Sequence, residues 1–130
     1  MAIAEGRVFA FDDPTAIRTD FLEAFAYEGE RQTIAYETAE FSCVCPFSGL
    51  PDFGVLKIEY VPEAVCVELK SLKYYLISYR NVGIYQEAAT SRLFTDLWAC
   101  LAPRYLKITT VYNTRGGIDA TCVVERGTKE

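Results

Sequence analysis

A cysteine and an aspartate stand close together among turn-forming residues, and their side chains could do covalent chemistry. Cys45 precedes Pro46, and Asp52 follows seven positions after the cysteine. A cysteine thiolate is a strong nucleophile, and a carboxyl group can pass a proton to an intermediate bound to it. The chain has no histidine, so the usual imidazole base is absent. Any reaction at this loop must therefore use thiol, carboxylate and ammonium groups.

Both residues also have plain structural interpretations. A free cysteine is often a small buried hydrophobic residue. An aspartate that follows a proline in a turn often only accepts hydrogen bonds from nearby backbone N–H groups. The position of Cys45 in a loop with Ser48 and Gly49 favours the catalytic interpretation. Its thiolate needs a stabilising environment, and the candidate cations are Lys70, Lys73 and Arg80.

A second group of charged residues follows downstream. Lys70 and Lys73 stand at i and i+3 on one face of an expected helix that begins near Glu68, where they either meet solvent or bind a phosphate. Arg115 before Gly116-Gly117 belongs either to a simple hairpin or to a phosphate contact. The glycine motifs of Rossmann sites and of P-loops are absent, so a nucleotide must be held in another way.

Length and composition limit the class of protein. The 130 residues fit a single domain, and the net charge of −5 argues against nucleic acid as a partner. The five cysteines are an odd number without metal-ligand spacing, so we expect neither a secreted disulfide framework nor a metal site. No segment predicts a membrane span or a signal peptide, which favours a cytoplasmic protein. The hydrophobic fraction of 51% suggests that other subunits cover part of the apolar surface.

Hydrophobic periodicity predicts the secondary structure. Residues 1–29 form an N-terminal arm, in which Asp12-Asp13-Pro14 caps a short helix over 15–25. Strands are expected at 31–38 and 55–61, with 65–68 returning antiparallel to the second, and at 107–112 and 118–124 around a hairpin. Two helices lie between them, one from Lys70 to about Tyr79 and one over 85–100. The order β-β-α-α-β-β predicts an α+β domain with an antiparallel sheet.

Four blocks of the sequence resemble the NADPH-dependent 7-cyano-7-deazaguanine reductases, the QueF-type nitrile reductases of queuosine biosynthesis. The most specific block is Glu68-Leu69-Lys70-Ser71-Leu72-Lys73-Tyr74-Tyr75, which is similar to the family signature at every defined position. The other blocks are residues 45–53, residues 79–87, and Pro103-Arg104 together with Arg115-Gly116-Gly117. The resemblance implies a tunnelling fold that assembles into a multi-subunit barrel, here a homo-oligomer of two stacked pentameric rings with sites between subunits.

The resemblance also implies roles for individual residues. Cys45 would attack the nitrile carbon of 7-cyano-7-deazaguanine to give a thioimide, and Asp52 would supply the proton that completes the addition. Hydrides from two NADPH molecules would then give the primary amine. Glu87 would bind the N–H edge of the deazaguanine. The other implied substrate residues are Val67, Glu68, Leu69 and Gln86, and the implied cofactor residues are Lys70, Ser71, Lys73 and Arg115.

One position departs from the family pattern. Many members have histidine just before the anchoring glutamate, and this chain has Gln86 there. Glutamine can orient a substrate by hydrogen bonding but cannot pass on a proton. More of the acid role is therefore expected to fall on Asp52.

Other functions fit parts of the sequence. Amidinotransferases of the archaeosine pathway keep the cysteine and the aspartate but lack the NADPH signature and act on modified tRNA. A pterin-type enzyme of the same fold would need histidine ligands for zinc, and a non-catalytic binding module requires an unreactive Cys45. The intact signature and the acidic charge favour the reductase.

Overall fold

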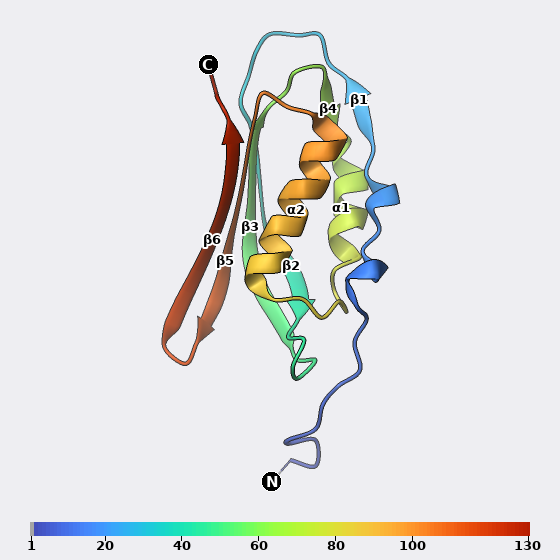
Figure 1. The fold of residues 1–130 in the computed structure, drawn as a ribbon, viewed down its shortest axis with the longest axis vertical. Coiled ribbons are helices and arrows are strands. Elements are labelled where there is room, and N and C mark those ends of the chain that lie inside the picture. Colours follow the sequence, from blue (N-terminus) through green and yellow to red (C-terminus); the bar gives the residue numbers. More distant parts are fainter. Residues whose placement is uncertain (1) are drawn as a thin grey trace.

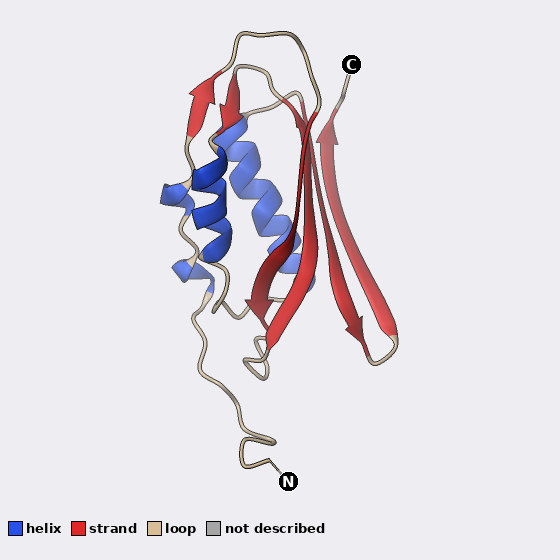
Figure 2. Ribbon diagram, turned by 180° about the vertical axis from the view of Figure 1, so that it is seen from behind, coloured by secondary structure: helices blue, strands red, loops and turns tan. Residues whose placement is uncertain are grey.

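A four-stranded antiparallel sheet carries both helices of the fold. The computed structural model describes residues 2–130, and the strand order in this sheet is β2-β3-β5-β6. The strands are β2 (Ile34–Val44), β3 (Pro51–Val61), β5 (Tyr105–Arg115) and β6 (Ile118–Gly127). The helices α1 (Leu69–Ile77) and α2 (Gln86–Leu101) lie on one face of the sheet (Figure 1). Figure 2 shows from behind that this face alone is covered. The predicted order β-β-α-α-β-β is confirmed for these elements.

The strands are longer than the sequence pattern predicts. β3 begins at Pro51, where it still pairs with Val44 of β2, and β6 runs on to Gly127 opposite Tyr105. Backbone pairing continues past the last alternating apolar residue, because ladder hydrogen bonds do not depend on side-chain type. As a result Asp52 lies on β3 opposite Cys43, and its predicted place in a turn is wrong.

The segment after β3 does not return along β3. β4 (Val65–Val67) instead pairs with β1 (Ala24–Ala26), in a separate two-stranded sheet. The predicted antiparallel return is therefore wrong. The physical reason is that β2 and β5 already occupy both edges of β3, which leaves β3 no free N–H and C=O groups for a third partner.

The helix predicted over residues 15–25 is also wrong. Two isolated 3₁₀ turns, Pro14–Ala16 and Thr19–Phe21, precede β1. The predicted capping residue Asp13 does accept a hydrogen bond from the Thr15 N–H at 2.8 Å. A helix of this length is marginal on its own, and pairing with β4 satisfies the backbone of the segment's end instead.

The core lies between the helices and the covered face of the sheet. In β3 the alternating residues Leu56, Ile58 and Tyr60 are almost fully buried, as the sequence pattern predicts, and Val61 at the strand end is buried as well. In α2 the sequence pattern predicts an apolar stripe of Ala89, Leu93, Leu97 and Cys100; the first three are fully buried and Cys100 is half-buried. Truncating a leucine of this kind costs roughly 2–5 kcal/mol of stability. Among residues 2–130, no helix has the length and apolar character that crossing a membrane requires.

Candidate active site

Cys45 lies in the tight turn that joins β2 to β3. Its N–H donates to the carbonyl of Leu50 at 2.9 Å, and its own carbonyl accepts from the Gly49 N–H at 2.8 Å. Gly49 has φ +74°, a conformation that favours glycine. These bonds close the loop and leave the thiol only half-buried, so Cys45 is accessible while its backbone is fixed.

The loop backbone stabilises the Cys45 thiolate. The nearby backbone N–H groups of Ser48 and Phe47 lower the pKa of the Cys45 thiol, and burial and Asp52 oppose them only in part. Neighbouring N–H groups that converge on one anion act as a fixed positive site. The expectation that Lys70, Lys73 or Arg80 would do this is wrong within one chain, because none of them shifts this pKa and all three line a groove along α1. Backbone donors thus favour the thiolate of Cys45 in a chain without histidine.

Asp52 is held beside this loop as a buried acid. Its carboxylate is only 5% exposed and forms an ion pair at 2.9 Å with the guanidinium of Arg115, the last residue of β5. Burial raises the pKa of Asp52, and Arg115 opposes the rise. The direction is the one that a proton donor near neutral pH requires. The sequence did not predict this ion pair.

Cys43 is a second thiol near the carboxylate, and it has a different chemical character. It is fully buried opposite Asp52 in the β2–β3 ladder. Burial, and then the nearby Asp52, raise the pKa of Cys43 to about 12. A thiol of that pKa stays protonated at neutral pH, so Cys45 alone of this pair can act as a nucleophile.

The start of α2 lies at the same end of the molecule. The connector between α1 and α2, residues 78–85, pairs with Val44, the last residue of β2. The Val44 N–H donates to the carbonyl of Val82 at 3.0 Å, and the Ile84 N–H donates to the carbonyl of Val44 at 3.2 Å. Gln86 is half-buried, and Glu87 is exposed in the first helical turn. A carboxylate at this point is favoured by the helix dipole. The fold therefore brings Cys45, Asp52 and the α2 N-terminus to one end.

The residues around Glu68 lie at the other end of α1. The Glu68 carboxylate caps this helix, accepting from the N–H groups of Lys70 at 3.0 Å and Ser71 at 2.6 Å. Val67 is buried, whereas Leu69 is exposed. A nine-residue helix is about 13 Å long. Within one chain, α1 therefore separates this segment from the connector that contacts the end of β2.

Ser71 has a structural role that the sequence did not indicate. Its hydroxyl donates to the Glu68 carbonyl at 2.7 Å and accepts from the Glu23 N–H at 3.0 Å. The side chain is buried and ties the N-terminal arm to α1. Its predicted contact with a cofactor stays a prediction.

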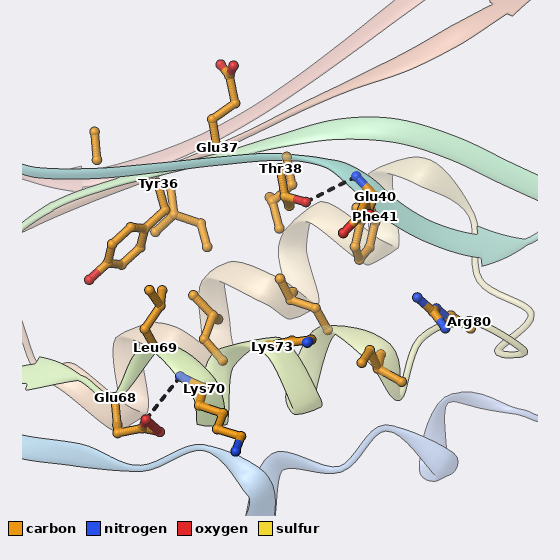
Figure 3. Close-up of a pocket in the computed structure, with 16 residues that line it drawn as sticks. Tyr36, Glu37, Thr38, Glu40, Phe41, Glu68, Leu69, Lys70, Lys73 and Arg80 are labelled. Carbon is orange, nitrogen blue, oxygen red and sulfur yellow. Dashed lines mark hydrogen bonds between the residues drawn. The ribbon is translucent and has the colours of Figure 1, made fainter.

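A groove of about 790 Å³ runs between β2 and α1. Leu72, Leu76 and Phe41 contribute to its apolar lining, and Lys70, Lys73 and Arg80 contribute positive charge. Glu68 and Lys70 lie toward one end and Arg80 toward the other (Figure 3). Within residues 2–130 these three cations form no ion pair with a carboxylate. The carboxylates of Glu37, Glu40 and Glu68 also line it, so the groove has the size of a small-molecule site and carries charges of both signs.

Comparisons with known proteins place the chain among relatives of one family. A family model described as QueF-like protein matches residues 51–130. Proteins named NADPH-dependent 7-cyano-7-deazaguanine reductase from Thermotoga petrophila and Thermotoga maritima are each 57% identical over 93% of this chain and 89% of theirs. One of that name from Chlorobium phaeovibrioides is 46% identical over 81% of this chain and 92% of its own.

A solved structure supports the fold. The apo archaeosine synthase QueF-Like superposes with a TM-score of 0.66, covering 78% of this chain and 98% of that chain at 24% identity. This likeness identifies the architecture as the predicted tunnelling fold, whereas the identity to the reductases extends over almost the whole sequence. The chain belongs to the family of the NADPH-dependent 7-cyano-7-deazaguanine reductases.

Proposed function

We propose that this protein reduces the nitrile of 7-cyano-7-deazaguanine to the primary amine 7-aminomethyl-7-deazaguanine with NADPH, a step of queuosine biosynthesis. The observation that carries the mechanism is the Cys45 thiolate, held by loop N–H groups beside the buried acid Asp52. The 57% identity to the Thermotoga reductases supports the choice of substrate and cofactor.

Covalent addition to Cys45 solves a chemical difficulty of the reaction. A nitrile accepts hydride poorly, and a protonated thioimide accepts it much better. The sulfur of Cys45 forms a bond to the nitrile carbon, and the nitrogen takes a proton from Asp52. After the first reduction at that carbon the sulfur leaves, and the bound imine is reduced in turn. Two hydrides and two protons convert the nitrile to the amine.

The groove along α1 fits NADPH, which supplies a hydride when bound. Lys70 and Lys73 lie on one helix face, and Arg80 lies at the far end of the groove, so they would hold the phosphates. Apolar residues such as Leu72 and Leu76 line the same groove and would contact the flat rings. Ser71 does not line this groove, and its bonds to Glu23 and Glu68 would hold α1 in place from the side of the N-terminal arm.

The substrate would lie over the start of α2. Glu87 is exposed there and can accept hydrogen bonds from the N–H edge of a deazaguanine, with the Gln86 amide beside it. The remaining contacts would come from the segment with Val67, Glu68 and Leu69. The substrate is proposed to be the free base, not tRNA, because the chain carries a net charge of −5.

We further propose that complete sites form between copies of the chain. The Glu68 segment and the Cys45 loop lie at opposite ends of one chain, which supports contributions from two copies. β2 and β6 are long edge strands of the sheet and could pair across copies into a barrel of stacked pentameric rings. The five free cysteines fit a reducing cytoplasmic location.

The test is to mix the protein with 7-cyano-7-deazaguanine without NADPH, and then to add NADPH. We expect a covalent adduct on Cys45 by peptide mass spectrometry, followed by its loss and formation of the amine. Turnover without an adduct at any cysteine would refute the covalent mechanism. Failure to produce the amine with NADPH would refute the proposed function.

A further inference from the structure

The end of the molecule that carries Cys45, Asp52 and the start of α2 is named the catalytic end here. The N-terminal arm contacts two loops at this end, the Cys45 loop and the connector before α2. The Phe9 N–H donates to the carbonyl of Ser48 in the Cys45 loop at 3.0 Å. Three residues later, the Asp12 N–H donates to the backbone carbonyl of Asn81 at 2.8 Å, and the Asp12 carbonyl accepts from the Gly83 N–H at 2.8 Å. In Figure 1 the arm (blue) rises past the end of the molecule that carries the β2–β3 turn. Residues 9–12, which we name the strap, thus join two separate loops.

The strap continues a ladder that reaches both catalytic segments. Asp12 forms a parallel bridge with Val82, and Val44 forms another with Gly83. Three chain segments therefore lie side by side: the strap, the connector before α2, and the end of β2. Val44 is bonded directly to Cys45, and the connector leads into Glu87. The strap lies outermost in this ladder, and Phe9 adds a second attachment at Ser48.

Two glycines make room for the strap. A Cβ on Gly49 would lie 2.1 Å from the Phe9 carbonyl oxygen, and a Cβ on Gly83 would lie 2.3 Å from the Phe11 ring. Both distances are too short for any side chain. Gly49 also needs its positive φ, but Gly83 does not, so at Gly83 the packing of Phe11 is the constraint. The strap therefore packs tightly on both loops.

We propose that the strap is a positioning element of the active site, which fixes the spacing between the Cys45 loop and the connector that leads to Glu87. The inference rests on the proposed roles of Cys45 and Glu87. The Cys45 loop needs such support because Phe47 at its tip is 80% exposed and the loop has little packing of its own. The N–H groups that hold the thiolate belong to Phe47 and Ser48, and Phe9 bonds the carbonyl of Ser48.

A double-mutant cycle tests the connector end of the strap. Gly83→Ala places a methyl group against the Phe11 ring and displaces the strap, whereas Phe11→Ala removes the ring and keeps the backbone bonds. The readouts are the pH dependence of Cys45 alkylation by iodoacetamide and the rate of adduct formation. We expect Gly83→Ala to raise the Cys45 pKa by about one unit, because this is roughly the effect of losing one hydrogen bond to a charged group. We also expect it to slow adduct formation about tenfold. In the double variant the added methyl group meets no ring, so its Cys45 pKa and its rate of adduct formation are expected to equal those of Phe11→Ala alone.

A matched pair of proline variants tests the other end and does not depend on Gly83. Phe9→Pro removes the N–H that bonds Ser48, whereas the neighbouring Val8 N–H has no backbone partner within residues 2–130. We expect Phe9→Pro to shift the Cys45 pKa as above and Val8→Pro to leave it within about 0.3 units. Lower melting temperatures with an unchanged Cys45 pKa and adduct rate in both Phe9→Pro and Gly83→Ala would overturn the positioning role.

The two proposals fail in different ways. Alkylation of Cys45 needs no substrate, so a shifted pKa supports the strap even if the wild-type protein forms no adduct with the nitrile. The absence of an adduct would refute the covalent mechanism, and failure to form the amine with NADPH would refute the proposed function; neither result would refute the strap. A normal adduct in the wild type with no change in either strap variant would refute the strap alone.

Discussion

The catalytic end and the groove along α1 differ in how they hold their charged groups. At the catalytic end Asp52 is buried and paired with Arg115, and nearby loop N–H groups lower the pKa of the Cys45 thiol. Along the groove Lys70, Lys73 and Arg80 are exposed and form no ion pair within residues 2–130. The first arrangement is the one that the proposed reaction requires, because its dipoles would be fixed before the substrate arrives. The second is suited to binding and releasing an anion.

The largest effect is expected for the nucleophile. Cys45→Ala removes the only thiol whose pKa the loop lowers, so we expect no adduct and no measurable turnover. Mass spectrometry measures the adduct, and the rate of NADPH oxidation measures turnover. The control is Cys100→Ala in α2, which affects packing and is expected to change only the melting temperature. A Cys45→Ala enzyme that still reduces the nitrile would remove the chemical distinction between the two regions.

The second-largest effect is expected for Asp52, the proposed proton donor. Asp52→Asn keeps the shape and removes the proton, so turnover is expected to fall by roughly two to four orders of magnitude. Since burial raises the pKa of Asp52, the wild-type rate is expected to fall as pH rises through that pKa and the acid loses its proton. The variant is expected to lack this dependence. A near-normal rate with the same pH profile would show that another group donates the proton.

The groove cations are expected to act on binding more than on chemistry. In Lys70→Gln/Lys73→Gln the NADPH KM is expected to rise about tenfold, roughly the contribution of one charge-assisted contact, while adduct formation stays within about twofold. Lys107→Gln on β5, outside the groove lining, is the control. An unchanged NADPH KM in the double variant would move the phosphate site away from this groove.

The smallest effect is expected for Arg115, which tests the comparison between the catalytic end and the groove. The resemblance assigned Arg115 to the cofactor, whereas the structure pairs it with Asp52. Arg115 favours the carboxylate, so Arg115→Met is expected to raise the pKa of Asp52 further. The falling limb of the pH–rate profile is then expected to move toward higher pH by less than about one unit, because the guanidinium is half-exposed and screened. A raised NADPH KM with an unmoved limb would place Arg115 with the groove cations instead.

Much of the fold follows from local pattern. The alternation in β3 and the stripe in α2 are strong because each repeats over several buried positions, and their elements were predicted correctly. The turn at Gly116-Gly117 was predictable for a similar reason, since both glycines have the positive φ that the hairpin requires. Residues 15–25 and 65–68 failed because their backbone partners, β4 and β1, are distant in sequence.

The sequence by itself determined which chemical groups are present. It predicts Cys45 as the nucleophile and Asp52 as the acid by residue type and by resemblance, and it excludes imidazole chemistry through the absence of histidine. The tertiary structure decided what surrounds each group: N–H donors at Cys45, Arg115 at Asp52, and a protonated thiol at Cys43. The physical reason is that pKa and reactivity depend on burial and on neighbours brought together by the fold, which residue identity along the chain does not specify.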